Sequence, residues 1–363
     1  MIGNARRNEA AGGSQSRWRE TNERRVIDAL VSRGAQTQAD LARGTGLSRA
    51  TVSTIVRELA AGGAVSVTAT PGRRGSHVRA VPVHRCAAGI DIAADGVRVA
   101  LCSIGGSLIS EMVGDAGGDD PTLTAVRLLD ESLALAGSTR SALVGIGMRA
   151  AGPAAALAAA LGMPVRTDDD GTVRALAEAT WGAGRGARQV AYVEASERLL
   201  ARLIVDGRPH RARTGPAGEI GHLVVDADGE VCRCGNRGCL ETVAGTAAVL
   251  RAVRREPNEP LTWPDALRLA GDGDPRCRDV LGGAGRLLGI AIGRLCTLLA
   301  PGAVVLAGDL AAAGEVVLAP LRESLHRHAV PVAAEGVRVM TATLGERTAA
   351  LGATALATAC GTT

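Results

Sequence analysis

Three cysteines and one histidine lie close together in the middle of the chain. Cys232, Cys234 and Cys239 fall within eight residues, and His222 lies ten residues before the first of them. Three thiolates and one imidazole are a complete ligand set for tetrahedral Zn²⁺. Because this set leaves no open coordination position, the spacing predicts a structural zinc site and not a catalytic one.

Two glycines in the same stretch, Gly235 and Gly238, allow the tight turn that brings the sulfurs to one point. The alternative interpretation is a group of buried cysteines that bind no metal. A disulfide is disfavoured, because the rest of the chain has the composition of an intracellular protein. The other cysteines are scattered through apolar segments and are expected to be reduced core residues. They are Cys86, Cys102, Cys277, Cys296 and Cys360.

The residues around this cluster resemble the signature of the ROK family. The motifs are Glu219-x-Gly-His222, followed over residues 232–241 by Cys-x-Cys-Gly-x-x-Gly-Cys-Leu-Glu, and the resemblance extends with gaps over nearly the whole chain. This family groups bacterial sugar-responsive repressors with sugar kinases. The resemblance implies an α/β body with the two-lobed actin-like ATPase fold, in which the lobes close on a cleft.

The resemblance also implies which residues contact a sugar. The acidic run at residues 168–170 aligns with a family stretch that ends in Asn-Asp, so Asp170 stands where kinases have their general base. Carboxylates suit this task because vicinal hydroxyls can donate paired hydrogen bonds to them. His222 would use one ring nitrogen for zinc and the other for the ligand. A solvated loop is the alternative interpretation of the acidic run. The implied sugar contacts are Asp169, Asp170, Glu219, His222 and Glu241.

The phosphate-binding loops of the family's kinases are altered in this chain. Such loops are rich in glycine, because only backbone without Cβ atoms can approach phosphate so closely. Here residues 91–95 read Asp-Ile-Ala-Ala-Asp in place of Asp-x-Gly-Gly-Thr, and residues 196–202 lack the aligned glycines. Asp309 replaces one glycine of the pair on the adenosine side. These three losses predict that the protein is not an enzyme.

One further departure concerns the loop that closes over the sugar in the family. After a strand ending at Met148, residues 149–162 are much shorter than the usual Gly-Pro loop and include an alanine-rich helix. That helix has no polar group to offer a sugar. A ligand-independent DNA-binding protein therefore remains an open alternative.

The segment before this body predicts a winged helix-turn-helix domain over residues 21–83. Apolar residues between 26 and 31 have helical spacing, Thr37 can cap a second helix, and Ser48 can cap a third that ends at Ala61. A helix, a short helix, a glycine-containing turn and a third helix follow the helix-turn-helix order. A β-ribbon with its tip at residues 71–75 would form the wing.

The third helix would enter the major groove of DNA by its N-terminal end. Arg57 lies one turn further along and suits a phosphate, while Arg73 and Arg74 at the wing tip would reach the backbone or the minor groove. The alternative is a small helical domain whose basic face contacts another protein. The predicted DNA contacts are Ser48, Arg49, Ala50, Thr51, Ser53, Thr54, Arg57, Arg73 and Arg74.

The charge distribution agrees with a nucleic-acid partner. Residues 1–83 contain thirteen Arg and six acidic residues, a net charge of +7, so the rest of the chain carries −3 of the total of +4. All 41 basic residues are Arg, which excludes a Walker A phosphate loop and every mechanism that needs a lysine. Phe is absent, so the core must consist mainly of Ala, Val, Leu and Ile.

A length of 363 residues indicates two or three domains. We expect a disordered segment at 1–20, the DNA-binding domain at 21–83, a first lobe at 84–189 joined by a C-terminal helix at 346–363, and a second lobe at 190–345. No apolar run follows Arg6-Arg7, and the longest run of small apolar residues, at 150–163, is too short to span a bilayer. A cytoplasmic protein without a membrane partner is expected.

These features together predict a ROK-type transcriptional regulator, with repression of carbohydrate genes as the expected role. It would bind two-fold operator DNA as a homodimer or a dimer of dimers, because one head offers too few base contacts for useful specificity. Its effector would be a sugar or a sugar phosphate. A ROK sugar kinase with a DNA-binding extension is the second alternative that remains open.

Overall fold

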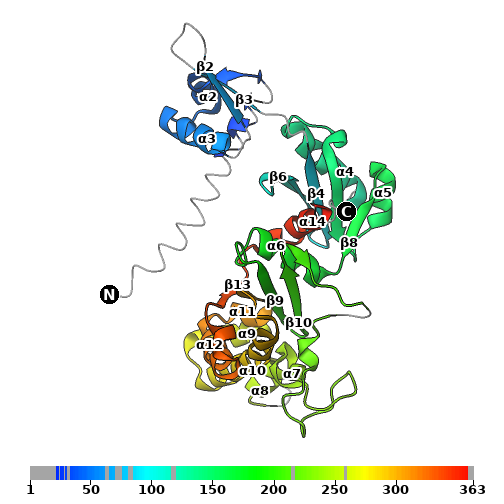
Figure 1. Ribbon diagram of the computed structural model, residues 1–363, viewed down its shortest axis with the longest axis vertical. Coiled ribbons are helices and arrows are strands. Elements are labelled where there is room, and N and C mark those ends of the chain that lie inside the picture. Colours follow the sequence, from blue (N-terminus) through cyan, green and yellow to red (C-terminus); the bar gives the residue numbers. More distant parts are fainter. Residues whose placement is uncertain are drawn as a thin grey trace. The chain divides into compact units, whose positions relative to one another are not determined.

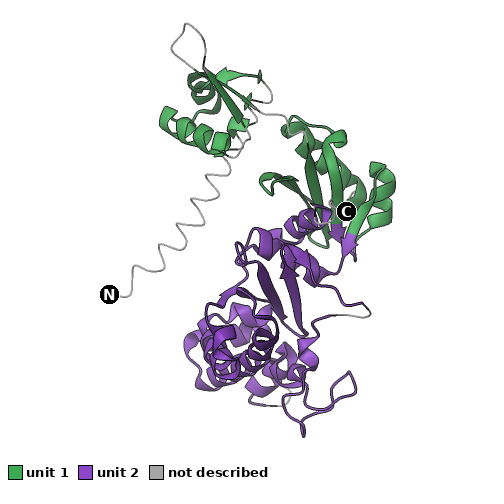
Figure 2. Cartoon of the chain, in the orientation of Figure 1, with its two compact units in different colours: residues 1–147, 152–166 green, residues 148–151, 167–363 purple. Residues whose placement is uncertain are grey.

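The structure is a computed structural model that divides into two compact units (Figure 2). The first unit comprises residues 1–147 and 152–166, and the second comprises residues 148–151 and 167–363. The residues that the structure describes are 22–23, 25–27, 29–30, 33–61, 65–69, 76–80, 85–115, 120–213, 217–256 and 260–358. The disorder expected at 1–20 and the wing tip at 71–75 lie outside these ranges.

The beginning of the first unit has the predicted helix-turn-helix order (Figure 1). The described residues between 22 and 33 are helical, and α2 (Gln38–Thr45) and α3 (Arg49–Ala61) follow. Thr37 caps α2 in a capping box with Asp40, as its position before the apolar residues predicts. Helix α2 ends before Gly46, whose left-handed φ of 72° forms the C-cap.

A small antiparallel sheet completes this domain, with the strand order β1-β3-β2. Val52, Ile55 and Val56 of α3 are buried against Val65 and Val78 of the sheet and the two earlier helices. This core fixes which face of α3 remains exposed. The strands are β1 (Gln36–Thr37), β2 (Val65–Ala69) and β3 (Ser76–Ala80).

The rest of the first unit is built on a five-stranded sheet with the order β6-β5-β4-β7-β8. Antiparallel pairing joins β4 to β5 and β5 to β6, and residues 94–95 form the tight turn of the first hairpin. Helix α4 (Pro121–Leu135) packs on this sheet, and α5 (Ala154–Leu161) is the predicted alanine-rich helix. The strands are β4 (Cys86–Ala93), β5 (Gly96–Ser103), β6 (Leu108–Gly114), β7 (Leu143–Arg149) and β8 (Val165–Asp168).

The second unit contains another five-stranded sheet, with the order β11-β10-β9-β12-β13. Strand β12 pairs in parallel with both β9 and β13, whereas β10 runs antiparallel to β9 and to β11. The strands are β9 (Gln189–Ala195), β10 (Leu199–Val205), β11 (Arg208–Pro209), β12 (Ala303–Ala307) and β13 (Arg338–Thr341).

Alternating residues of these strands face two different helical layers. Ala191 and Val193 of β9 belong to a core shared with helices α7 to α12, whereas Val190 and Tyr192 belong to a core shared with α6 (Asp170–Thr180) and α14 (Thr348–Thr358). Successive side chains of a strand point to opposite faces, so apolar residues at consecutive positions produce a sheet that is buried on both faces. The remaining helices are α7 (Leu240–Ala244), α8 (Thr246–Val253), α9 (Trp263–Asp272), α11 (Asp309–Ala312) and α13 (Pro331–Ala334).

Helices α10 (Pro275–Leu299) and α12 (Glu315–His328) pack very closely against each other. A Cβ atom at Gly285 would lie 2.4 Å from Val317 O, and one at Gly289 would lie 2.4 Å from Leu321 O. Among the described residues, α10 is the one helix long and apolar enough to cross a membrane, and 56% of its most apolar window is buried inside the protein. Its apolar character is therefore accounted for by the core.

The two units do not follow the domain boundaries expected from the sequence. Residues 167–189 and helix α14 were expected in the first lobe, but they belong to the second unit. The physical reason is the core that α6 and α14 share with β9 and β12, which includes Val173, Leu176 and Leu356.

Candidate functional site

The predicted zinc ligands converge on one point. Cys232 Sγ lies 3.5 Å from His222 Nδ1, and Cys234 Sγ lies 3.6 Å from Cys239 Sγ. All four ligand atoms lie within 4.8 Å of one another. A tetrahedral Zn²⁺ ion with bonds of about 2.3 Å to sulfur and about 2.0 Å to nitrogen keeps its ligand atoms about 3.5–3.8 Å apart. Both the donor set and its spacing fit zinc.

The backbone of this zinc knuckle, residues 219–245, is held by short-range pairing. Isolated β-bridges join Val224 to Cys239 and Val231 to Arg237, and Cys239 is the residue that precedes α7. Gly238 adopts a φ of 63°, and a Cβ atom there would lie 1.3 Å from Asp226 O. Only glycine fits this position, as the predicted tight turn requires.

The protonation of the thiols depends on what they bind. Burial raises the pKa of Cys239 to about 12, and hydrogen bonds with the neighbouring thiols add to this effect. A backbone hydrogen bond from Asn236 chiefly lowers the pKa of Cys234. Zinc coordination requires thiolates, so metal binding at this cluster would release protons.

His222 presents its two ring nitrogens to different neighbours. Nδ1 faces the thiols, whereas Nε2 lies 4.0 Å from Glu219 Oε2. The nearest cation of Glu219 is Arg198, whose Nη2 lies 3.8 Å from the same oxygen. This arrangement is compatible with the expected double use of the imidazole, for a metal on one side and a ligand on the other.

Glu241, another predicted sugar contact, is held by Arg233. Arg233 Nε donates to Oε1 at 2.6 Å, and Nη2 donates to Oε2 at 3.2 Å. Burial alone would raise the pKa of Glu241, but the hydrogen bond and charge of Arg233 outweigh it and hold the pKa below its usual value.

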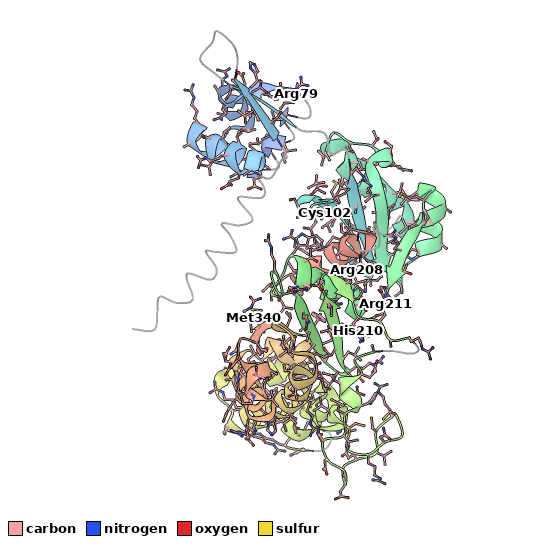
Figure 3. The ribbon with its side chains drawn as sticks, in the orientation of Figure 1. Arg79, Cys102, Arg208, His210, Arg211 and Met340 are labelled. Carbon is pink, nitrogen blue, oxygen red and sulfur yellow. The ribbon has the colours of Figure 1, made fainter. Side chains whose placement is uncertain are left out.

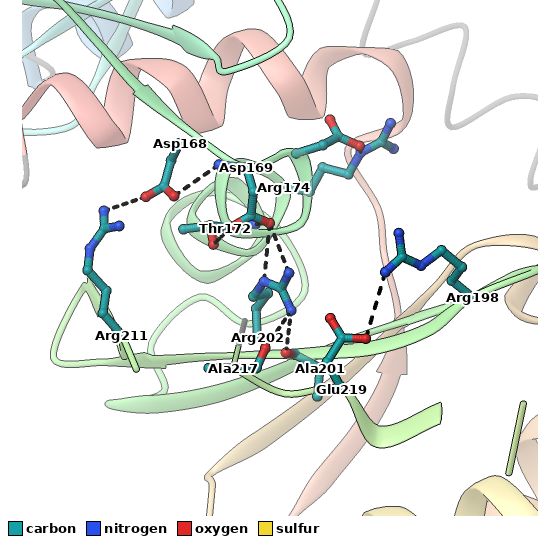
Figure 4. Close-up of polar contacts among 11 residues, drawn as sticks. Asp168, Asp169, Thr172, Arg174, Arg198, Ala201, Arg202, Arg211, Ala217 and Glu219 are labelled. Atoms are coloured by element: carbon teal, nitrogen blue, oxygen red, sulfur yellow. Dashed lines mark hydrogen bonds and ion pairs between the residues drawn. The ribbon is translucent and has the colours of Figure 1, made fainter. Parts of the chain in front are cut away.

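Asp169 caps α6 and also binds an arginine (Figure 4). Its carboxylate accepts hydrogen bonds from Thr172 N at 3.1 Å and Thr172 Oγ1 at 2.5 Å, and Arg202 Nε and Nη2 donate to it at 3.2 and 3.1 Å. Arg202 Nη1 donates to Ala217 O at 2.8 Å, two residues before Glu219. The structure thus links Asp169 to the segment that carries Glu219.

The other acidic residues of the run at 168–170 have cationic partners as well. Arg174 Nε donates to Asp170 Oδ2 at 2.8 Å, and Arg149 Nη1 donates to Asp170 Oδ1 at 3.4 Å. Asp168 pairs with Arg211, which lies with Arg208 and His210 on the segment beginning at β11 (Figure 3). The run is therefore an ion-paired strand end and helix start, and not merely a solvated loop.

The altered phosphate-loop positions of the second unit bind one another. Asp309 N donates to Ser196 Oγ at 3.0 Å, and Thr246 Oγ1 donates to Asp309 Oδ2 at 3.0 Å. Ser196 belongs to the turn between β9 and β10, and Asp309 begins α11. Two of the three altered positions, one at Ser196 and one on the adenosine side at Asp309, are therefore hydrogen-bonded to each other and to Thr246.

An open pocket of about 400 Å³ adjoins this hydrogen-bonded group beside the last residues of β12 and β13. Arg174 and Tyr192 line it together with Gly308, Thr341 and Thr348. Ligands of open α/β sheets commonly bind at the carboxyl ends of parallel strands, so this pocket is a second place where a small molecule could bind.

Sequence reasoning did not assign a role to Glu178, which is completely buried in α6. Its carboxylate accepts hydrogen bonds from Thr343 N at 2.8 Å, Leu344 N at 2.9 Å and Ala183 N at 2.8 Å. It ties α6 to the segment before α14. A glutamate at a core-facing helical position was the available signal, because a charge is rarely buried without partners.

The predicted DNA contacts on α3 lie outside the core of the domain. Ser48 Oγ accepts a hydrogen bond from Thr51 N at 3.1 Å, so this serine caps the helix. Ser48, Arg49, Ala50, Thr54 and Arg57 are exposed, and Thr51 and Ser53 are half-buried. Arg73 and Arg74 lie outside the described residues.

Comparison with known sequences matches each of the two parts of the chain to a protein family. The ROK family profile matches residues 146–359, more than half of the chain, and the MarR family profile matches residues 20–74. The xylose repressor of Bacillus subtilis is 22% identical over 361 residues, which cover 92% of this chain and 94% of the repressor.

Two further relatives match part of the chain at higher identity. A glucokinase of Halalkalibacterium halodurans is 30% identical over 205 residues, and the DNA-binding transcriptional repressor Mlc of Escherichia coli is 30% identical over 187 residues. These matches cover 52% and 49% of this chain but only 62% of the glucokinase and 46% of Mlc.

Solved structures show the same architecture. A ROK family transcriptional regulator described as a homologue of E. coli Mlc superposes with a TM-score of 0.62 at 22% identity, over 94% of this chain and 96% of that one. A ROK hexokinase from Thermus thermophilus gives a TM-score of 0.62 at 26% identity, over 75% of this chain and 97% of the hexokinase. The predicted fold class, a winged helix-turn-helix followed by an actin-like body, is confirmed, and the chain belongs to the ROK family.

Proposed function

We propose that this chain is a DNA-binding transcriptional regulator that represses carbohydrate genes and responds to a sugar or sugar phosphate. One observation carries the proposal: an exposed recognition helix, α3, precedes a ROK body whose kinase phosphate loops are replaced. The relatives named as repressors support it. The expected location is the cytoplasm, where operator DNA is found.

The DNA-binding role rests on α3. Its buried residues Val52, Ile55 and Val56 face the domain core, which leaves Arg49 and Thr54 exposed at the N-terminal end. In helix-turn-helix proteins this end of the second helix of the motif contacts base edges in the major groove. The proteins bind two half-sites as symmetric dimers, and we propose a homodimer or a dimer of dimers here for the same reason.

The effector would bind near Glu219, His222 and Glu241, with Asp169 and Asp170 as further contacts. Support comes from the chain of contacts that joins Asp169 through Arg202 to the segment before Glu219. A bound zinc ion would hold His222 and the knuckle in one shape, so that Nε2 of the imidazole is available on the ligand side. The zinc would be structural, because the four protein ligands complete its coordination.

The decisive experiment is footprinting of the purified, zinc-loaded full chain on its own upstream DNA, with and without a panel of sugars and sugar phosphates. We expect a protected two-fold site, and we expect at least one effector to change the protection. Absence of protection on every promoter fragment would reject the regulator.

A sugar kinase with a DNA-binding extension is the competing function, because a glucokinase and a hexokinase are among the relatives. Against it stand the altered loops at residues 91–95 and 196–202 and the Asp309 carboxylate on the adenosine side. We expect ADP release at the background rate in a coupled assay with a panel of hexoses. Turnover above that of a heat-inactivated sample would establish an enzyme.

A further inference from the structure

Each predicted sugar-contacting carboxylate has an arginine within ion-pair distance. Asp168, the neighbour of Asp169, has one as well. The pairs are Asp168 with Arg211, Asp169 with Arg202, Asp170 with Arg149 and Arg174, Glu219 with Arg198, and Glu241 with Arg233. Five carboxylates thus have six guanidinium partners, which gives this set of residues a formal charge of +1.

This pairing has a consequence for ligand choice. A carboxylate that already accepts hydrogen bonds from an arginine has fewer lone pairs to offer to sugar hydroxyls. A neutral sugar that displaced a largely buried arginine such as Arg202, which is 14% exposed, would leave its guanidinium without a counter-ion, which is costly. A ligand with its own negative charge avoids this cost, because the displaced guanidinium gains a new anionic partner.

The arginines differ in how many of their N–H groups already donate hydrogen bonds within the protein. Arg202 donates to Asp169 and to the backbone oxygens of Ala201 and Ala217, and its side chain is only 14% exposed. Arg198, by contrast, is 58% exposed, and its Nη2 lies 3.8 Å from Glu219, beyond direct hydrogen-bonding distance. Arg198 therefore has the most donor capacity to offer to a ligand bound at Glu219.

The location of Arg198 also favours ligand contact. It lies in the tight turn between β9 and β10, and Ser196 N donates to its carbonyl oxygen at 3.2 Å. The turn therefore sets its Cα position, while the long side chain remains adjustable. In Figure 4 the Arg198 side chain extends toward the Glu219 carboxylate.

We propose that the effector of this site is an anionic sugar, a phosphate ester or a sugar acid, whose charged group binds Arg198 while its hydroxyls bind Glu219. This inference rests on the proposed sugar-responsive function and narrows its ligand class. The planar guanidinium presents parallel N–H donors that match the oxygens of both phosphate and carboxylate. A neutral monosaccharide has no anionic group that could accept both of these parallel hydrogen bonds.

The test is calorimetry on the zinc-loaded full chain at fixed ionic strength with matched ligands. The panel contains glucose, glucose 6-phosphate and glucuronate, then N-acetylglucosamine and its 6-phosphate, and inorganic phosphate alone. At least one anionic sugar should bind about tenfold or more tightly than its neutral counterpart. The phosphate and carboxylate members show which anionic group the site prefers.

Arg198→Gln should lower the affinity for that anionic sugar about 10- to 100-fold and bring it close to that of the neutral sugar. Arg327→Gln is the matched control, because Arg327 is an exposed arginine on α12 that pairs with Glu323. The control should leave binding unchanged. Circular dichroism and the melting temperature of both variants show whether they are folded.

Several outcomes would overturn the inference. Neutral and anionic sugars of equal affinity, with Glu219→Gln weakening both, would reject the anionic class but leave the sugar-responsive regulator standing. Inorganic phosphate that binds as tightly as the sugar phosphates would indicate anion binding without sugar recognition, and would reject it too. No binding by any member would reject both the inference and the sensor half of the proposed function, whereas footprinting would still decide the DNA-binding half.

Discussion

Arg202 illustrates how one side chain can position a carboxylate of the proposed ligand site. Its guanidinium is anchored to the backbone oxygens of Ala201 and Ala217, and from there it donates twice to Asp169. Because Asp169 also caps α6, the start of that helix and the segment before Glu219 are held by the same group. A change at this one arginine would therefore disturb two ligand-site segments together.

Replacement of Asp169 by Asn should isolate the charge of this pair. Burial alone would raise the pKa of Asp169, but hydrogen bonds from Thr172 and the charge of Arg202 hold the pKa below its usual value. Asn still caps a helix, so Asp169→Asn should cost about 1 kcal/mol or less at neutral pH after solvent screening.

The sign of the pH dependence follows from the lowered pKa. The stabilisation by the Asp169 carboxylate is complete above the unfolded value of about 3.9 and is lost as the pH falls through the folded value. The difference in urea midpoint between wild type and Asp169→Asn should therefore shrink as the pH falls below about 4. A difference that grows on acidification would contradict this assignment.

Arg49 is the residue of choice for testing base recognition, because it is the exposed first residue of α3. Arg49→Ala should weaken operator binding by about 1–3 kcal/mol if the side chain reads a base. Electrophoretic mobility shift with the footprinted operator measures this. Arg327→Ala removes the same charge from the second unit and should leave the midpoint unchanged. An unchanged midpoint for Arg49→Ala would remove it from the interface.

Among the structural elements, the proposed zinc knuckle and the α10–α12 pair would be stabilised in opposite ways. Residues 219–245 contain two short helical segments, at 220–222 and 240–244, and two isolated bridges, so a bound metal ion would supply stabilisation that regular secondary structure does not. Helices α10 and α12 instead bury small residues at close range. The knuckle should therefore be sensitive to loss of a metal ligand, and the helix pair to an increase in side-chain size.

Loss of one zinc ligand should unfold the knuckle. Cys234→Ser, or chelation of the wild type, should lower stability by more than about 4 kcal/mol and abolish metal binding. Atomic absorption gives the metal content and thermal unfolding gives the stability. Cys296→Ala alters a buried thiol outside the cluster and should retain the metal. One zinc per chain in Cys234→Ser would contradict the ligand set.

The close packing of α10 on α12 predicts opposite effects for two glycines of the same helix. A Cβ atom at Gly289 would meet Leu321 O at 2.4 Å and Ser324 Cβ at 2.6 Å, so Gly289→Ala should destabilise by about 1–3 kcal/mol. Gly283 has no contact closer than 3.7 Å, so Gly283→Ala should stabilise by about 0.5–1 kcal/mol. Urea unfolding measures both. Equal effects would argue against the close helix contact.

In the molecule as a whole, the proposed function combines a helix-turn-helix domain with a ROK body. The family contains both kinases and regulators, so the body alone does not distinguish them. The winged helix-turn-helix and the self-bonded corner of Ser196, Thr246 and Asp309 point to regulation. The proposed DNA contacts lie in the N-terminal domain, whereas the altered kinase loops lie in the ROK body.

Dimeric binding predicts a fixed spacing in the operator. Two recognition helices related by a two-fold axis contact half-sites whose centres lie about 10 bp or a multiple of that distance apart. Inserting about 5 bp between the half-sites should therefore abolish tight binding, whereas inserting about 10 bp should restore part of it. Competition mobility shifts with the three DNAs measure this. Equal affinities would indicate independent binding of single heads.

The features that depend on local spacing could be predicted from the amino-acid sequence. The Cys₃His set, the caps at Thr37 and Ser48, and the three altered phosphate loops were readable because their residue types and separations limit what they can do. The same applies to the order of the helices in the DNA-binding domain and to the α/β class of the body, which the periodicity and the family motifs predicted.

The partners of these residues, by contrast, depend on how the chain folds in three dimensions. Arg202 lies 33 residues from its partner Asp169 in sequence, and Arg149 lies 21 residues from Asp170. Glu178 binds backbone amides 165 and 166 residues away. No periodic pattern encodes such separations, because they arise when α6, β10 and the segment before α14 pack onto a common sheet. For the same reason a shared core, and not chain order, places α6 and α14 in the second unit.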